Sequence, residues 1–177
     1  MKRKNIKDII KNHFFDNPSD KLRVREIEKI LKIPLPSVIR YCKELEKENL
    51  LRINQIGNSV FYTADRISEK YILEKKLNNI RILYESEIIN YLKKELSNPL
   101  IILFGSFAKG EDIENSDIDI YIETLSNKKL NLDKFKKLLK REIHLFIYKN
   151  INSISNIHLS NNIINGIILN NYIEIFK

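Results

Sequence analysis

The chain has 177 residues, of which 43% are hydrophobic and 31% are charged, with only 4 glycines and 4 prolines. This composition excludes collagen-like, disordered and loop-dominated chains, and it supplies enough apolar side chains for one domain or two small ones. The net charge of +8 is uneven, because residues 1–65 carry 14 basic and 9 acidic side chains whereas residues 99–177 carry 10 and 9. The basic excess at the N-terminal end favours a polyanionic partner, although a lysine-rich soluble surface would have the same composition.

A single cysteine, Cys42, excludes an internal disulfide and a cysteine-rich zinc site, and we expect it in the core. The longest apolar run, residues 99–104, is far shorter than the roughly 20 residues that cross a bilayer. The first residues lead into no signal-like apolar stretch. We therefore expect a cytoplasmic protein without a membrane partner.

Three helices are predicted in the first 50 residues from apolar side chains at helical spacing. The first covers residues 6–14 and ends at the turn-forming segment 16–20, the second covers residues 24–31, and the third begins at Pro36. The third helix buries Val38, Cys42 and Leu45 and leaves a polar, cationic and aromatic set pointing outward. That outward set is Ser37, Arg40, Tyr41 and Lys43.

Two β-prone runs follow, residues 50–53 and 59–63, and Gly57-Asn58 between them suits a tight hairpin. Three helices and a hairpin in this order resemble a winged helix-turn-helix domain. The resemblance implies double-stranded DNA as a partner, with Ser37, Arg40, Tyr41 and Lys43 at bases or phosphates and Arg52 and Asn58 on the wing. Winged helices also serve as protein-interaction or dimer modules, and Glu44, Glu46 and Glu48 on the third helix would repel phosphate.

Residues 66–98 are predicted to form a connector, either one long helix or two abutting helices, because residues 68–97 contain neither Gly nor Pro. Its apolar side chains form one stripe with nearly heptad spacing. The members of the stripe are Leu73, Leu77, Ile80, Tyr84, Ile88 and Leu92. The stripe is expected to dock on the flanking domains, and the alternative is a homodimeric coiled coil.

The strongest chemical pattern begins where the apolar strand 100–104 runs into Gly105-Ser106. Ten residues separate Ser106 from Asp117, which begins the alternating strand Asp117-Ile118-Asp119-Ile120. The two carboxylates therefore leave the same face of a strand while the isoleucines pack behind it. Because adjacent carboxylates repel each other, a divalent cation is their natural partner, and oxygen ligands favour Mg²⁺ or Mn²⁺.

The turn and Lys109 can serve phosphate oxygens, since Gly105 permits close backbone approach and Ser106 adds a hydroxyl. A Gly-Ser turn followed by Asp-x-Asp on the next strand resembles the minimal nucleotidyltransferases of the DNA polymerase β superfamily. That resemblance implies a small mixed sheet flanked by helices, metal on Asp117 and Asp119, and a nucleoside triphosphate held by Gly105, Ser106, Lys109 and Ser116. The implied reaction transfers a nucleoside monophosphate to a hydroxyl and releases pyrophosphate.

The superfamily commonly places a third acid on the following strand, which here is predicted at residues 142–148. Alternation puts Glu142, His144 and Phe146 on one face of that strand, with His144 at the position where the acid is expected. His144 can act as a base but is a poor ligand for Mg²⁺, and Glu142 could replace the acid only if its side chain reaches the metal. The candidate catalytic residues are therefore Asp117, Asp119, Glu142 and His144.

The remaining segments complete an α+β domain. Residues 133–141 are predicted to form an amphipathic helix with Phe135, Leu138 and Leu139 inward, and residues 154–164 form another helix. Gly166 is expected to end that helix before a strand at residues 167–169, and Tyr172 to Phe176 are expected to finish the sheet.

The predicted organisation is a winged helix-turn-helix domain at residues 1–65, a connecting helix at 66–98 and a nucleotidyltransferase-like domain at 99–177. It resembles two-domain prokaryotic regulators, especially archaeal ones, and antitoxins that pair with HEPN-type toxins. The first hypothesis is a DNA-binding, Mg²⁺-dependent enzyme that transfers AMP from ATP, or another nucleotide, to a protein or RNA hydroxyl. The alternative is a catalytically degenerate transcriptional regulator whose C-terminal domain binds a nucleotide or a protein.

Overall fold

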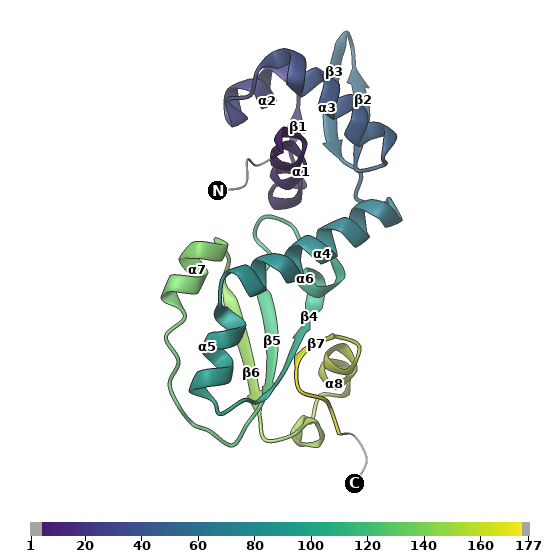
Figure 1. Cartoon of the computed structure of the whole chain (residues 1–177). Helices are drawn as coiled ribbons and strands as arrows, with labels where there is room; N and C mark the ends of the chain where they lie inside the picture. The colour runs from purple at the N-terminus through teal and green to yellow at the C-terminus, as the bar shows by residue number, and fades with distance from the viewer. Residues whose placement is uncertain (1–4, 175–177) are drawn as a thin grey trace. The chain divides into compact units, whose positions relative to one another are not determined.

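A computed structural model describes residues 5–174 of the chain. The chain divides into two compact units, residues 1–75 and 76–177, and each unit is described by itself (Figure 1). The predicted connector is therefore divided between the units. No helix in residues 5–174 is both long enough and apolar enough to span a membrane.

The N-terminal unit contains three helices and a three-stranded antiparallel sheet with strand order β1-β3-β2. Its elements are α1 (Ile6–Asp16), β1 (Lys21–Leu22), α2 (Val24–Leu31), α3 (Leu35–Lys47), β2 (Leu51–Ile56) and β3 (Ser59–Ala64). Asn5 caps α1 by accepting a hydrogen bond from the Lys7 amide, and Pro36 lies in the first turn of α3. The three helices and the hairpin were predicted, whereas β1 was not.

The core of this unit forms where the apolar faces of the three helices meet the sheet. Ile10, Phe14, Val38 and Leu45 are fully buried, and Cys42 lies among them as expected. Burial raises the pKa of the Cys42 thiol to about 12, so this cysteine is a protonated packing group at neutral pH.

The C-terminal unit contains a four-stranded mixed sheet with strand order β6-β5-β4-β7. Strands β5 and β6 are parallel, whereas β4 is antiparallel to both β5 and β7. The elements of this part of the chain are α4 (Glu69–Glu85), α5 (Ile88–Glu95), β4 (Leu100–Phe104), α6 (Gly105–Lys109), β5 (Ile118–Glu123), α7 (Asp133–Leu139), β6 (Ile143–Tyr148), η1 (Ile151–Ser153), α8 (Ile157–Ile164) and β7 (Ile167–Asn170). The predicted α+β class and the mixed sheet are confirmed.

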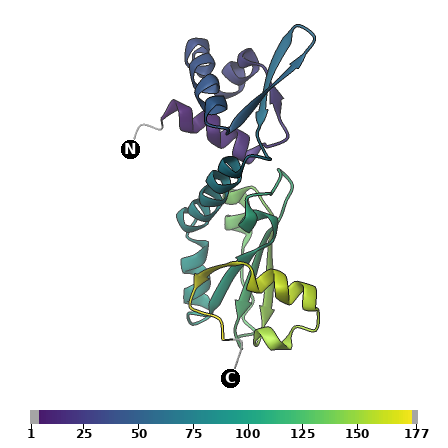
Figure 2. The same ribbon diagram turned by 90° about the vertical axis from the view of Figure 1, so that its right-hand side faces the viewer.

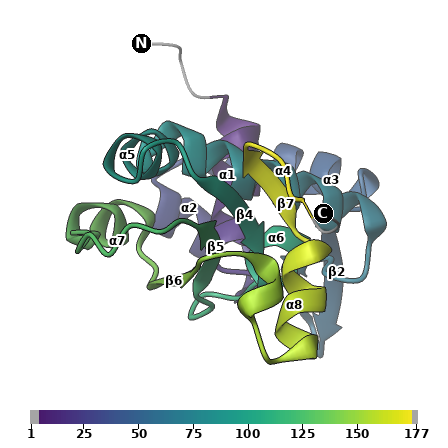
Figure 3. The same cartoon turned by 90° about the horizontal axis from the view of Figure 1, so that it is seen from below.

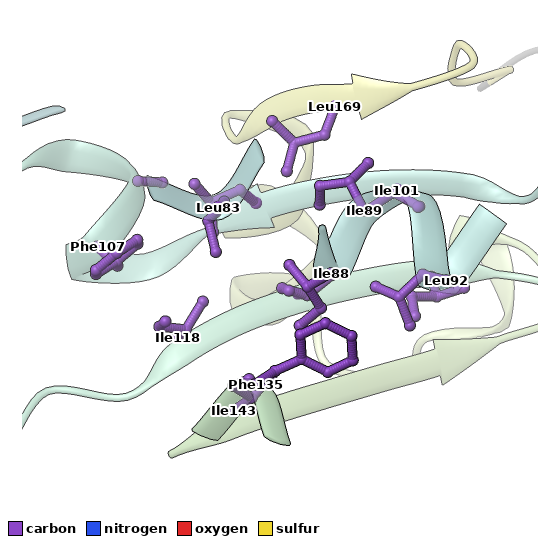
Figure 4. Packing of buried hydrophobic residues seen from close by; sticks show 14 of the residues in the cluster. Leu83, Ile88, Ile89, Leu92, Ile101, Phe107, Ile118, Phe135, Ile143 and Leu169 are labelled. Atoms are coloured by element: carbon purple, nitrogen blue, oxygen red, sulfur yellow. The ribbon is translucent and has the colours of Figure 1, made fainter. Parts of the chain in front are cut away.

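Helices α5 and α7 and the C-terminal half of α4 cover one face of this sheet. Leu83, Ile88 and Leu92 pack there against the isoleucines of β4 and β5, and Phe135 of α7 joins the same cluster (Figure 4). The isoleucines that alternate with Asp117 and Asp119 therefore anchor β5 in a dry core.

Helix α8 lies against the opposite face of the sheet, as Figures 2 and 3 show, and it packs on β4. Ile151, Ile154 and Ile163 bury Ile102 and Tyr121 on this side. The second face also carries Asp119, so the two carboxylates lie at one end of a face whose other end is packed by η1 and α8.

The connector contains two helices, α4 and α5, which was one of the two predicted alternatives. They are separated at Ser86-Glu87, where Glu87 has a left-handed φ of 64°. The predicted stripe is wrong for α4, because Leu73, Leu77 and Tyr84 are 56%, 55% and 47% exposed.

Helix α4 instead buries Tyr71, Asn78, Asn79 and Leu83. The helix has apolar side chains on two faces, and helical spacing alone does not tell which one packs. Lys75 is buried as well, and the three polar side chains Lys75, Asn78 and Asn79 hid the buried positions of α4 from a search for apolar periodicity.

Two further predictions in the C-terminal unit differ from the structure. Leu138 was expected to face inward but is 62% exposed, because α7 buries Phe135 and ends at Leu139, followed by Lys140 in a left-handed conformation. Tyr172 to Glu174 form no strand, and the rest of that predicted strand lies outside the described residues.

Leucines 83 and 77 of α4 provide a matched test of which face is buried. Leu83→Ala is expected to lower the free energy of unfolding by about 2–5 kcal/mol, because it opens a cavity in the core of the C-terminal unit. Leu77→Ala on the exposed face is expected to change it by less than about 0.5 kcal/mol. Urea unfolding followed by circular dichroism measures both changes, and equal losses in the two variants would contradict this assignment.

Candidate functional site

Gly105 and Ser106 directly follow strand β4, and Gly105 lies against the carboxylate of Asp119. Gly105 has a φ of +76°, which favours glycine, and a Cβ atom on it would lie 2.5 Å from Oδ2 of Asp119. Glycine is therefore required here for both its backbone conformation and its size. Ser106 follows as a half-buried residue at the start of α6.

Asp119 occupies the centre of a row that crosses three strands. Its register partners are Phe104 of β4 on one side and His144 of β6 on the other. Asp117 immediately precedes β5, and its side chain is 42% exposed whereas that of Asp119 is 26% exposed. The alternation predicted from the sequence thus places both carboxylates next to the same imidazole.

His144 Nδ1 lies 3.6 Å from Oδ2 of Asp117 and 3.7 Å from Oδ1 of Asp119. Both separations are longer than a hydrogen bond. The imidazole is 53% exposed, and it faces the two acids with Nδ1 rather than with Nε2. The Glu142 side chain is engaged elsewhere, because its carboxylate lies 2.5 Å from the ammonium group of Lys136 on α7. The structure therefore brings His144, rather than Glu142, to both aspartates.

The electrostatics of the pair follow from its partial burial. Burial raises the pKa of the Asp119 carboxyl, the imidazole of His144 opposes that rise, and the nearby charge of Asp117 adds to it. A cation between the two carboxylates would remove this repulsion.

The donor set fits a hard divalent cation held by Asp117 and Asp119. Within residues 5–174 no three His, Cys, Asp or Glu side chains are grouped so as to enclose a metal ion. Two carboxylates are, however, what a protein commonly supplies to Mg²⁺, whose other ligands are water and substrate phosphates.

A buried polar network, which sequence reasoning missed, supports the loop that leads to Asp117. The guanidinium group of Arg141 donates to Asp112 Oδ2 at 2.8 Å and to the carbonyl oxygens of Ile113 and Ser116 at 2.5 and 2.9 Å. Asn79 of α4 donates to Asp112 Oδ1 at 2.7 Å. Arg141 and Asp112 are 8% and 0% exposed, so this ion pair depends on its many hydrogen bonds.

Two residues predicted to hold phosphate are engaged or placed elsewhere. The Ser116 hydroxyl accepts a hydrogen bond from the Ile113 amide at 2.9 Å and thereby closes a turn of the same loop. Lys109 is exposed at the end of α6, and no contact joins it to the two aspartates. Gly105 and Ser106 remain the parts of the phosphate prediction that lie beside Asp119.

The residues predicted to contact DNA lie on α3 and on the hairpin of the N-terminal unit. Arg40 and Lys43 are exposed, and the Arg40 guanidinium lies 4.3 Å from the ring centroid of Tyr41 and donates to its hydroxyl. Ser37 and Tyr41 are half-buried. Arg52 and Asn58 are exposed, on β2 and at the hairpin turn.

Comparison with known proteins agrees with this geometry. Residues 85–169 match the family model of the nucleotidyltransferase domain. The predicted nucleotidyltransferase domain is therefore confirmed for this stretch, which contains both aspartates, the Gly-Ser turn and His144.

One related protein comes from Methanocaldococcus jannaschii, and its name describes it as a candidate protein adenylyltransferase. It is 39% identical over 79 residues, which are 43% of this chain. The match spans 50% of the length of that relative. No solved structure matches the chain.

Replacing Asp119 by Asn tests whether its charge carries a cost in the folded state. Because the pKa of Asp119 is raised on folding, its ionised form destabilises the protein at pH values above the ordinary value of 3.8. Asp119→Asn is thus expected to raise the melting temperature near neutral pH with a chelator present. This gain should disappear under acidic conditions in which the carboxyl is protonated in both states.

The same unfolding experiment with Mg²⁺ or Mn²⁺ provides the control. The cation should stabilise the native chain, by about 2.7 kcal/mol when it is present at 100 times its dissociation constant, and should not stabilise Asp119→Asn. A lower melting temperature for Asp119→Asn in chelator would show that the carboxylate is a net stabilising group.

Proposed function

We propose that the C-terminal unit transfers a nucleoside monophosphate, AMP from ATP, to a hydroxyl group of a protein. The observation that carries this proposal is the convergence of Asp117, Asp119 and His144 beside Gly105. The relative from M. jannaschii supports AMP as the transferred group and a protein as the acceptor. RNA is the second acceptor class, and labelling experiments distinguish the two.

The two aspartates and His144 have different roles in the proposed reaction. Asp117 and Asp119 would hold Mg²⁺, which when bound neutralises charge on the phosphates during the transfer. The acceptor oxygen forms a bond to the α-phosphorus, and the bond from that phosphorus to the oxygen that bridges to the β-phosphate breaks, so that pyrophosphate leaves. Nε2 of His144 accepts the hydroxyl proton, while the aspartates on its Nδ1 side favour a proton on that nitrogen.

Incubation of the full chain with cell extract, Mg²⁺ and ATP labelled at the α-phosphate is expected to label a macromolecule. Asp117→Asn and Asp119→Asn should abolish the labelling, because each removes a carboxylate from the pair. His144→Ala should reduce the initial rate about 100-fold if the imidazole accepts the proton. Protease or ribonuclease treatment of the product then identifies the acceptor class.

His144→Asp provides the matched control for the base. A carboxylate at this position can accept the same proton, so this variant should label faster than His144→Ala. Labelling that persists in both aspartate variants would exclude the proposed site. No labelling by the native chain, together with intact DNA binding, would favour the non-enzymatic regulator.

We further propose that the N-terminal unit binds double-stranded DNA through α3. The specific support is the state of Glu44 and Glu48, two of the three acids that would repel phosphate. Lys7 of α1 lies 3.6 Å from the carboxylate of Glu44 and 2.5 Å from that of Glu48, so a cation offsets both charges. Arg40 and Lys43 are exposed on the same helix. An antitoxin would use this unit to regulate its own transcription and the C-terminal unit to modify a toxin of the HEPN type.

Substitutions on α3 test DNA binding. On a sequence obtained by selection from random duplexes, Arg40→Ala should cost about 1–3 kcal/mol and relax specificity if the guanidinium reads a base. Lys43→Ala should weaken binding to all sequences and reduce the salt slope by about 1. Lys149→Ala removes an exposed charge from the C-terminal unit and serves as the control. Equal affinities for all four proteins in fluorescence anisotropy would argue against α3 as the DNA-binding element.

A further inference from the structure

An aromatic pair lies beside Asp119 on the same face of the sheet. Phe104 of β4 and Phe146 of β6 lie on opposite sides of β5, yet their ring centroids are 5.1 Å apart at an interplanar angle of 67°. The rings therefore meet over β5, next to the row that contains Asp119 and His144. Edge-to-face contact with Phe104, which is 5% exposed, holds the ring of Phe146 in a defined orientation.

Phe146 is more exposed than Phe104 and Tyr121, the aromatic residues nearest to it on β4 and β5. Tyr121, its register partner on β5, is fully buried, whereas Phe146 remains half-buried. Helix α8 packs on β4, and Phe146 is only partly buried against the cluster that Ile151, Ile154 and Ile163 form on this face. An aromatic side chain is thus partly open to solvent two residues along β6 from His144.

We propose that the ring of Phe146 is the surface on which the base of the bound nucleotide stacks. This inference rests on the proposed function, because the triphosphate must be held at Asp117 and Asp119. A nucleoside triphosphate bound there can place its base only about one ribose away. The step from His144 to Phe146, two residues on one strand face, is about 6.6 Å, so the ring lies close to the atoms that would hold the phosphates.

We expect the base on Phe146 to belong to the nucleotide that donates the monophosphate rather than to the acceptor. The base of the donor is covalently tied to the phosphates, so it must lie near the aspartates. An acceptor hydroxyl can belong to a molecule without any base. Stacking on an aromatic ring accepts all bases, since each has a π face, so the platform supplies affinity for a nucleotide without fixing its identity.

The chain contains no tryptophan, so Phe146→Trp introduces a single indole reporter. Addition of ATP with Mg²⁺ should change the fluorescence of Phe146→Trp saturably, whereas tripolyphosphate with Mg²⁺ should not, because it has no base. Tyr91→Trp is the matched control, since Tyr91 lies on α5 and packs against Phe135 on the opposite face of the sheet. Its emission should not respond to ATP.

Calorimetric binding gives a second readout on the full chain. Phe146→Leu should weaken ATP binding about ten-fold or more and leave tripolyphosphate binding unchanged, because only the base loses its partner. Phe146→Tyr keeps the ring and should keep the affinity for ATP. Thermal unfolding of both variants distinguishes loss of the platform from loss of the fold.

The outcomes separate this inference from the proposed function. If ATP binds the native chain but neither perturbs Phe146→Trp nor loses affinity in Phe146→Leu, the platform is excluded and the transferase proposal stands. If neither ATP nor tripolyphosphate binds the native chain, both proposals fail. A fluorescence response to oligoadenylate but not to ATP would assign the ring to an acceptor RNA and overturn the assignment to the donor.

Discussion

The partial burial of two neighbouring carboxylates at one end of β5 is the constraint on which the candidate site of the C-terminal unit depends. Asp119 cannot move away from Asp117, because its own strand is anchored by buried isoleucines and its carboxylate rests against Gly105. A side chain at Gly105 would force the carboxylate out of this place. The sheet thus holds two carboxylates close together that would move apart in a flexible loop. A cation that binds between them relieves their repulsion, and this relief adds to the free energy of cation binding.

Arg141, which lies outside the sheet, fixes the loop that leads to Asp117. The loop before Asp117 has no regular secondary structure, so its carbonyl oxygens need partners other than a helix or a strand. A guanidinium group carries five donors in a fixed plane and can serve Asp112 and several carbonyls together, which an ammonium group cannot do with the same geometry. The loop is therefore held by Arg141 together with Asn79 and the Ser116 hydroxyl, and the position of Asp117 depends on these contacts.

The sequence was most informative where one local period dominates. Strands β4 and β5 and the three N-terminal helices follow from local spacing, and the structure contains them, whereas Gly105 and Ser106, predicted as a turn, begin α6. The buried face of α4 could not be predicted in this way, because Asn79 is buried for its hydrogen bonds to Phe107 and Asp112 rather than for hydrophobicity. The partners of that network lie 28 and 33 residues away from Asn79, beyond any local pattern.

Alternation along β6 was sufficient to place His144 on the face of Asp119, but it could not decide between His144 and Glu142. The structure shows which residue lies beside the aspartates, because Lys136 of α7 forms an ion pair with the Glu142 carboxylate. If Asp117 and Asp119 hold a hard cation, as proposed, they supply two oxygen ligands, and the cation would obtain the rest from water and phosphate. Cation and nucleotide would then strengthen each other's binding by the same factor, since linkage between two ligands is reciprocal. A site of this kind holds its cation most tightly when the nucleotide is present, which couples the neutralisation of the two carboxylates to the arrival of the substrate.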